Sequence, residues 1–528
     1  MAGATSKSID FSKAIVDSVP NIADWLVVMP IAICLIGGAF LLMLLKNPVL
    51  QSRLATIFLA GLVYSNFQLL QHVLENNTVT MTMGRWLPPF GISFTVDIFG
   101  AVLALVSALI AFLASLYAAV DVPEKGRRFG FYPFLLFMMA GVNGAFLTGD
   151  IFNLYVWFEV MLISSFGLLI LGGEEKQIDG ALKYAVLNLL ATTFFLIATG
   201  YLYGVFGTLN MADLAIKVPL AETSAPMITI GTLFFFAFAM KAAAFPVNFW
   251  LPASYHTPGI VVSALFAGLL TKVGIYALIR TLVVVLPGMQ AGLGDLIIYV
   301  AIATMLTGGL GALGQSSVPR LLGYLVIAGI GSILAGVAIG TSASLFGSIF
   351  YAVHSMITMT ALYLAYGILN RMSRGADDLW SLGGAYKAAP GLSVLFLILV
   401  IAASGLPPFS GFWPKLALVE AALRGNHNLL AATILISSVL ITIAMGRVWA
   451  MAFWRSGPQD VEDGSEGVEL AVIEKSQRVA LYTPVIVLVA LIVVIGIWPN
   501  PLFGLLQEAA NGLVNPDGYI KSVFGGER

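Results

Sequence analysis

Apolar runs of about 20 residues recur along this chain, and they decide what it can fold into. An α-helix of that length crosses the hydrocarbon core of a bilayer, which is roughly 30 Å thick. Of the 528 residues, 59% are hydrophobic and 10% are charged. An ordinary soluble domain carries roughly 25% charged residues, so we predict a polytopic membrane protein with about 14 spans. Their centres are expected near residues 35, 62, 106, 138, 160, 193, 237, 269, 304, 328, 356, 405, 440 and 490.

The backbone of these spans leaves little choice of secondary structure. Inside hydrocarbon every N–H and C=O group must be paired within the protein, so only helices or a closed barrel can cross. We find no alternation of period two and expect an all-α fold. Lysine and arginine are more frequent in the connections on the predicted inner side, with Arg280 counted among the outer residues. The positive-inside rule then predicts that both termini lie outside.

Charge and residue types exclude several classes of function. A net charge of −1 does not favour nucleic acid as a partner. The four histidines are far apart, and the one cysteine, Cys34, lies in the first apolar run. We therefore expect no metal site and no disulfide. No glycine-rich phosphate loop is present, so ATP is not the expected energy source, and no cofactor is predicted.

Three lysines lie inside predicted spans: Lys241, Lys272 and Lys415. A lysine at the centre of a membrane helix costs roughly 2.5–3.5 kcal/mol on insertion scales, which makes its presence informative. Such a lysine stays charged beside water or a carboxylate, or it gives up its proton. Because it can change between those states, the sequence indicates proton transfer within the bilayer.

Two of these lysines lie beside predicted helix breaks. Lys241 is followed by Pro246 and by the run Trp250-Leu-Pro, and Lys415 is preceded by Gly405-Leu-Pro-Pro. Proline removes a backbone donor, and a break within the bilayer is tolerated where the freed groups are buried or wet. Paired interrupted helices are typical of transporters with internal repeats. Simple packing kinks are the alternative.

Other polar residues within the apolar runs have weaker signals. Glu159 lies about 13 Å from one end of its predicted helix, and therefore near the middle of the membrane. It is either a structural ion-pair partner or a carboxylate that modulates the proton affinity of a nearby lysine. His354 is either a satisfied core histidine or a proton relay. We expect Asp97 to anchor a span at the interface and Asp150 to cap a helix. Glu420 and Arg424 are expected to form a surface pair.

Four stretches together resemble the antiporter-like subunits shared by respiratory complex I and the Mrp-type cation/proton antiporters, and within that family the D-type Mrp subunits most. The resemblance covers roughly residues 90–450. The stretches are Thr148-Gly-Asp-Ile-Phe-Asn-Leu-Tyr-Val-Trp-Phe-Glu159, Met240-Lys241-Ala-Ala-Ala-Phe-Pro246 with Trp250-Leu-Pro-Ala-Ser-Tyr-His256, Gly268-Leu-Leu-Thr-Lys272, and Ser404-Gly-Leu-Pro-Pro-Phe-Ser-Gly-Phe-Trp-Pro-Lys415.

The resemblance implies fourteen helices with two inverted five-helix repeats, in which helices 7 and 12 are broken. The implied boundaries are residues 1–128 for helices 1–3, 129–282 for the first repeat, 293–455 for the second repeat, and 456–528 for the last loop, helix 14 and the tail. The resemblance also implies proton-translocating roles for five residues. These are Glu159 as partner of Lys241, Lys272 as central relay, His354 in the relay, and Lys415 as terminal lysine.

One stretch departs from the family pattern. Many D-type subunits have a second histidine and a lysine on helix 11, where this chain has Ser355 and Met359. The relay between Lys272 and Lys415 would then depend on His354 and water.

The resulting hypothesis is a subunit of a multi-subunit antiporter in the bacterial plasma membrane, not an enzyme, which carries protons in exchange for Na⁺. Its expected partners are the other subunits of the complex and the lipid bilayer. Two alternatives remain open. One is a proton-pumping membrane subunit of a redox-driven complex similar to complex I, and the other is a scaffold whose buried charges only dock neighbouring subunits.

Overall fold

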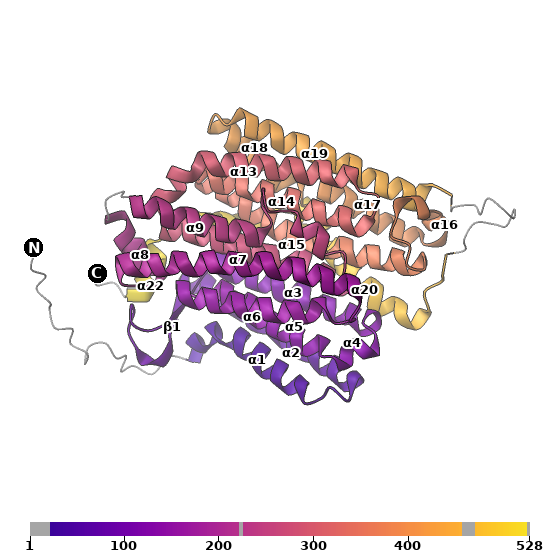
Figure 1. Cartoon of the computed structure of the whole chain (residues 1–528), viewed down its shortest axis with the longest axis horizontal. Helices are drawn as coiled ribbons and strands as arrows, with labels where there is room; N and C mark the ends of the chain where they lie inside the picture. Colours follow the sequence, from indigo (N-terminus) through magenta and orange to yellow (C-terminus); the bar gives the residue numbers. More distant parts are fainter. Residues whose placement is uncertain (1–21, 221–224, 457–469, 525–528) are drawn as a thin grey trace, which may run out of the picture.

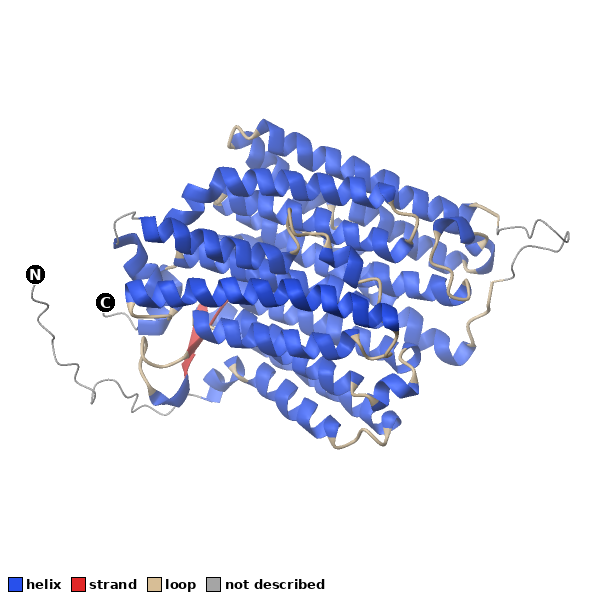
Figure 2. Ribbon diagram, in the orientation of Figure 1, coloured by secondary structure: helices blue, strands red, loops and turns tan. Residues whose placement is uncertain are grey.

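A computed structural model describes residues 22–220, 225–456 and 470–524. Helices run side by side along the long axis of one bundle, with short connections at its two ends (Figure 1; Figure 2). In the described part of the chain, ten helical segments are long and apolar enough to cross a membrane, and four shorter apolar helices accompany them. The predicted class of helical polytopic membrane protein is confirmed, whereas the number of 14 spans and the inverted repeats stay predictions.

The first half of the bundle runs to the end of the eighth predicted span. Its described helices are η2 (Ile22–Val27), α1 (Met29–Leu42), α2 (Pro48–Asn76), η3 (Met83–Arg85), α3 (Ile98–Asp121), α4 (Glu124–Arg128), α5 (Phe131–Leu147), α6 (Ile151–Leu169), α7 (Glu175–Phe206), α8 (Met211–Lys217), η4 (Val218–Leu220), α9 (Ala225–Ala242), α10 (Trp250–Ser254), α11 (Ile260–Leu265), η5 (Phe266–Leu270), α12 (Thr271–Ile279) and η6 (Arg280–Val285).

The second half follows in the same bundle. Its described helices are α13 (Pro287–Gly314), α14 (Val318–Ile339), α15 (Ser342–Met372), η7 (Leu379–Ser381), α16 (Ala385–Ala388), α17 (Pro390–Ser404), α18 (Phe412–Arg424), α19 (Asn428–Trp449), η8 (Ala450–Trp454), α20 (Lys475–Ile497), α21 (Asn500–Val514) and α22 (Asp517–Phe524).

The centre of the bundle is formed by two long helical segments. The most apolar stretch of α15 is entirely buried, and the continuous segment from Ile260 to Val285 is nearly so. By contrast, α7 and α19 present many large apolar side chains on the outside of the bundle, as expected for helices that face lipid or another protein. Polar side chains on the central segments therefore lie far from the lipid.

A small antiparallel sheet lies in one connection of this otherwise helical fold, where no alternation of period two was expected. Strands β1 (Thr78–Thr82) and β2 (Ser93–Asp97) pair from Thr78 opposite Asp97 to Thr82 opposite Ser93. The run Thr-Val-Thr-Met-Thr alternates half-buried and buried residues, which is the period-two pattern of a strand. This short alternation was missed because it lies in a connection between two spans, outside the segments that must be helical.

The first and last described elements lie at the same end of the bundle. Both η2 and α22 contact β1, and the hydroxyls of Thr80 and Ser522 share a hydrogen bond of 2.8 Å (Figure 1). In a bundle that spans the membrane these two elements lie on one side, whereas the chain ends themselves lie outside the described residues. Which side that is stays a prediction.

Candidate functional site

Lys241 lies in the last turn of α9, at the end of the first half of a broken helix. After Ala242 the backbone leaves the helix through Ala243, whose φ is 62°, and helical structure resumes at Trp250. The indole Nε1 of Trp250 donates to the carbonyl of Met240 over 3.1 Å and so bridges the break. The predicted break just after Lys241 is therefore present.

One aromatic and one acidic residue of α6 act on the ammonium of Lys241. Its Nζ lies 4.8 Å from the ring centroid of Phe158, within the range of a cation–π contact. Glu159 is close enough for its charge to act on Lys241. Glu159 is half-buried, and among the described residues its Oε1 atom has no hydrogen-bond partner although it is buried. Glu159 and Lys241 thus interact through their charges, and the described part of the chain contains no direct ion pair between them.

Lys272 follows a local change of helix type. The segment η5 is a π-helical turn, and the Nζ atom of Lys272 donates to the backbone carbonyl of Ala267 within it, over 2.6 Å. Such turns leave backbone groups available and often occur at functional sites. Gly274, two residues after Lys272, lets α12 approach α9 closely, because a Cβ atom there would lie 3.0 Å from the backbone nitrogen of Ala242.

His354 lies on the central helix α15, where it faces the break between α17 and α18. Its Nδ1 atom shares hydrogen bonds with the hydroxyls of Ser410, at 2.8 Å, and Thr358, at 3.2 Å. The charges of Lys415 and Lys272 both reach the imidazole. The charges of both lysines therefore disfavour a positive charge on His354.

Lys415 lies in the first turn of α18, across the break from the end of α17. Its Nζ atom donates to the carbonyl of Ser404 over 2.8 Å and lies 3.4 Å from that of Ala403. Its aliphatic stem lies against Gly405, whose φ of 80° ends α17 in the left-handed region. Since the last carbonyls of a helix carry partial negative charge, they provide a favourable seat for an ammonium group.

All three lysines and His354 are buried inside the bundle, each exposed by 6% or less. Electrostatic interactions join the predicted site residues in two groups, one with Glu159 and Lys241 and the other with Lys272, His354 and Lys415. Where the family pattern has titratable groups, Ser355 and Met359 are buried on α15. Met359 adds no group that could carry a proton.

A buried ion pair was missed by the sequence analysis. Arg280, assigned to an outer connection, is 1% exposed and makes two hydrogen bonds of 2.7 Å to the carboxylate of Asp97. The guanidinium also lies over the ring of Tyr519 in α22, at 5.1 Å. Asp97 opens α3 as expected, and its carboxylate is held by Arg280, whereas its place at the membrane interface stays a prediction. The sequence signal for this pair was an acid at the start of one apolar run and a base at the end of another, both expected on the same side of the membrane.

The smaller expectations can be compared with the structure one by one. Asp150 caps α6, since its carboxylate accepts from the N–H of Asn153 over 2.8 Å. Glu420 and Arg424 form the expected exposed pair, and Cys34 is buried without a disulfide. In the described part of the chain, no cluster of three or more His, Cys, Asp or Glu side chains could hold a metal ion.

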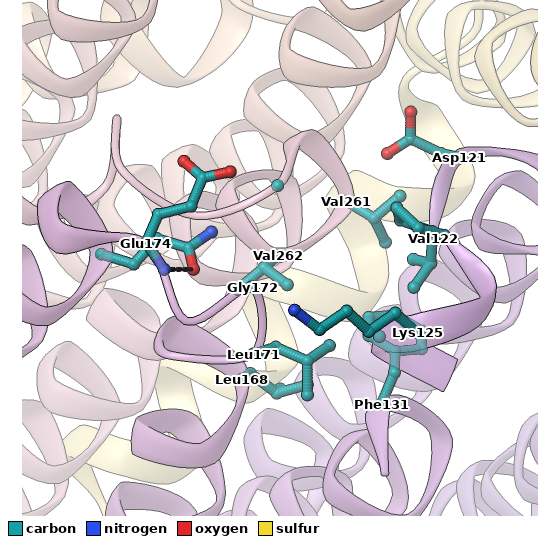
Figure 3. A pocket seen from close by; sticks show the side chains of 14 residues that line it. Asp121, Val122, Lys125, Phe131, Leu168, Leu171, Gly172, Glu174, Val261 and Val262 are labelled. Carbon is teal, nitrogen blue, oxygen red and sulfur yellow. Dashed lines mark hydrogen bonds between the residues drawn. The ribbon is translucent and has the colours of Figure 1, made fainter. Parts of the chain in front are cut away.

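A cavity of about 500 Å³ opens at the end of the bundle where α3 ends and α11 begins (Figure 3). In this view the ammonium of Lys125 points between Val262 and Leu171, and the carboxyl groups of Asp121 and Glu174 lie on opposite sides. Asp121 accepts a hydrogen bond from the N–H of Val261 and pairs with Arg371 of α15 over 3.4 Å. The cavity thus reaches the first turn of the continuous helical segment that carries Lys272.

The fold and these buried groups define a class of polytopic membrane protein that holds several titratable side chains in its interior. Residues 148–442 match the transmembrane family described as NADH:quinone oxidoreductase/Mrp antiporter. The chain belongs to this family.

Individual relatives cover nearly the whole chain. It is 37% identical to the D-type Na⁺/H⁺ antiporter subunit of Alkalihalophilus pseudofirmus, over 94% of this chain and 99% of that protein. A chain in the structure of the Mrp complex from Dietzia sp. superposes with a TM-score of 0.87 at 30% identity, covering 96% of this chain and all of that one. A chain of respiratory complex I from Thermus thermophilus superposes with a TM-score of 0.79 at 25% identity, over 93% of this chain and all of that one.

Proposed function

We propose that this chain is the proton-translocating subunit of a multi-subunit Na⁺/H⁺ antiporter in the bacterial plasma membrane. One observation carries the proposal: three lysines are buried inside the bundle, two of them beside a break in a helix and the third beside a π-helical turn. The likeness to D-type antiporter subunits and to an Mrp complex supports Na⁺ and H⁺ as the exchanged ions and the presence of sister subunits.

Burial of a lysine among helix ends supplies both states that proton transfer requires. Desolvation disfavours the ammonium, whereas carbonyl oxygens and a nearby carboxylate favour it. These opposing effects keep the two states close in free energy, so a small displacement of an acceptor can load or unload the amine. At Lys241 that displacement is a change in the distance to the Glu159 carboxylate. At Lys415 it is a change in the distance from the amine to the backbone carbonyl of Ser404.

The proposed path follows the two electrostatic groups. A proton is loaded near Glu159 and Lys241, passes to Lys272, and moves by way of His354 to Lys415, where it is released. Water is needed between Lys272 and His354, because Met359 offers no titratable group there. The cavity beside Asp121 supports an access route from one end of the bundle, since it reaches α11.

No multi-carboxylate cation site lies among the described residues of this chain, so Na⁺ is proposed to pass elsewhere in the complex. The membrane potential supplies about 2.3 kcal/mol per charge per 100 mV, which an unequal exchange ratio could use. The two inverted repeats, with boundaries at residues 129–282 and 293–455, remain part of this proposal.

The test is proton flux in everted membrane vesicles that contain the assembled complex. Addition of Na⁺ without a redox donor should cause proton movement that a pH-sensitive dye reports. Lys241→Ala and Lys415→Ala should each decrease this flux by about two orders of magnitude, the contribution expected of a proton-transferring group. Lys183→Ala is the matched control, because Lys183 forms only an exposed pair with Asp179.

Two results would overturn the proposal. If both lysine variants assemble and flux persists, the buried charges only dock neighbouring subunits. If proton movement requires NADH or another reductant and ignores Na⁺, the chain belongs to a redox-driven pump.

A further inference from the structure

The break between α17 and α18 is enclosed by two neighbouring helices. On one side, Ser410 shares a hydrogen bond with His354 of α15, and a Cβ atom on Gly411 would lie 2.9 Å from the imidazole Nε2. On the other side, Gly496 near the end of α20 touches the backbone of the break. Only the first of these two contacts involves a residue of the proposed relay.

The contact with α20 leaves no room for a side chain. A Cβ atom on Gly496 would overlap the carbonyl oxygen of Pro408 and would lie 2.6 Å from the Cα atom of Phe409. Both neighbours are backbone atoms, which cannot rotate away as a flexible side chain could. A glycine is therefore required for α20 to approach the break this closely.

A hydrogen bond fixes the same contact from the other half of the broken helix. The indole Nε1 of Trp413, two residues before Lys415, donates to the carbonyl of Gly496 over 2.8 Å. The ring of Trp413 packs against Phe503 of α21 at 5.5 Å, and Phe503 in turn packs against Phe346 and Phe350 of α15. The start of α18 is thus held by α20, α21 and α15 together.

The other broken helix is closed in a different way. Both breaks are followed by the dipeptide Phe-Trp, at Phe249-Trp250 and at Phe412-Trp413. The indole of Trp250 donates to Met240 of the preceding helix half, so this break is bridged locally. The indole of Trp413 donates instead to α20, so the position of α18 relative to α17 depends on a separate helix.

From this geometry we infer that Gly496 and Trp413 are positioning residues that set the distance between the Lys415 amine and the backbone carbonyl of Ser404. The inference rests on the proposed function and deepens it by giving the last membrane helix a part in proton release. Displacing Pro408 and Phe409 moves the chain between Ser404 and Lys415, which changes the distance from the amine to its acceptors.

The experiment compares variants of the assembled complex by Na⁺-dependent proton flux across a range of pH. Gly496→Ala forces the break away from α20, and we expect flux to fall about three- to tenfold, since displacements near 1 Å at a transfer site have effects up to about 10²-fold. We also expect its pH profile to move. Trp413→Phe keeps an aromatic ring at this position but loses the N–H donor, and should move the profile the same way by a smaller amount.

The readout must separate positioning from mere loss of folded protein. The shape of the pH profile does so, because it is independent of the amount of complex. Among the described residues, the titratable group that acts on Lys415 from α15 is His354, and α17 has no charged residue. Glu420 and Arg424 pair with each other at the exposed part of α18. The charged residues of α20 and α21 are exposed, namely Lys475 and Arg478 at the end of α20 remote from Gly496, and Glu508. Gly504→Ala is the control: it lies in α21, where an added Cβ meets nothing within 4 Å.

Each outcome has one meaning. A wild-type pH profile in both Gly496→Ala and Trp413→Phe overturns the inference, even if less complex is recovered. If Gly496→Ala does not assemble, Trp413→Phe decides alone. Lys415→Ala, measured alongside, separates the proposed function from the positioning role. Persistent flux in Lys415→Ala refutes the proposed function. Lost flux in Lys415→Ala together with wild-type pH profiles in Gly496→Ala and Trp413→Phe refutes only the positioning role.

Discussion

The ammonium nitrogen of Lys415 lies 2.8 Å from the backbone carbonyl oxygen of Ser404, across a break in the helix that contains both residues. A continuous helix would use that carbonyl for its own hydrogen bond, four residues further along. Because the helix ends at Ser404, the carbonyl is available to a charged donor instead. Lys272 uses a comparable opportunity, since its amine reaches the carbonyl of Ala267 in a π-helical turn.

The carboxylate of Glu159 provides the first prediction. Glu159→Gln keeps the size of the side chain but removes the charge that acts on Lys241, so Na⁺-dependent proton flux should fall by about tenfold or more. Glu159→Asp should retain an intermediate rate, because the charge remains but lies further away. Flux in vesicles is the measurement, and Glu420→Gln, at an exposed position of α18, is the control. Wild-type flux in Glu159→Gln would remove this residue from the pathway.

A second prediction concerns water in the cavity beside α11. The chain has one cysteine, which is buried, so an introduced thiol can be followed without background. Val262→Cys lines the cavity and should react with a small, charged, water-soluble methanethiosulfonate, because a thiol needs water to form the reactive thiolate. Labelling should also slow proton flux. Leu182→Cys, on the apolar outer face of α7, should stay unlabelled. Equal labelling of the two sites would show that the reagent does not report this cavity.

The cap of α6 gives a prediction about stability and pH. Burial raises the pKa of the Asp150 carboxyl to about 6, although the hydrogen bond from the Asn153 N–H opposes this shift. The folded state therefore binds the proton more tightly than the unfolded chain, so the stability that Asp150 contributes is greatest at low pH and is lost as pH rises through 6. Asp150→Asn keeps a capping oxygen without the charge, and its stability relative to wild type should increase between pH 5 and pH 8.

Asp150→Ala separates the cap from the charge. It removes the acceptor for the Asn153 N–H as well as the charge, so its free energy of unfolding should lie about 1 kcal/mol below that of Asp150→Asn at either pH. Thermal unfolding of the purified complex in detergent measures both variants. A difference between Asp150→Asn and wild type that does not depend on pH would contradict the raised pKa.

The Asp97–Arg280 pair predicts a large structural effect. Arg280→Leu leaves a buried carboxylate without its partner and should destabilise the protein by about 3–5 kcal/mol. Arg424→Leu breaks an exposed pair with Glu420 and should cost about 1 kcal/mol or less. Thermal unfolding of the two variants makes the comparison. Similar small effects in both would mean that water reaches Asp97 in the folded protein.

Many features of the fold could be predicted because they are local properties of the chain. The apolar runs require helices in hydrocarbon, and the prolines near Lys241 and Lys415 require breaks beside those lysines. The short strands β1 and β2 were missed, since five alternating residues give a weak signal outside the spans. Asp150 could be assigned as a cap because its partner, Asn153, is three residues away.

The sequence by itself determined that three amines lie at membrane depth and that two of them lie next to interrupted helices, because length, hydropathy and proline act within one segment. Only the tertiary structure decided which groups meet: Arg280 with Asp97, His354 with Ser410, and Trp413 with Gly496. These partners are far apart along the chain, and their contact depends on how helices pack against one another. No local pattern contains that information, since the same side chain is satisfied equally well by any acceptor that packing brings within reach.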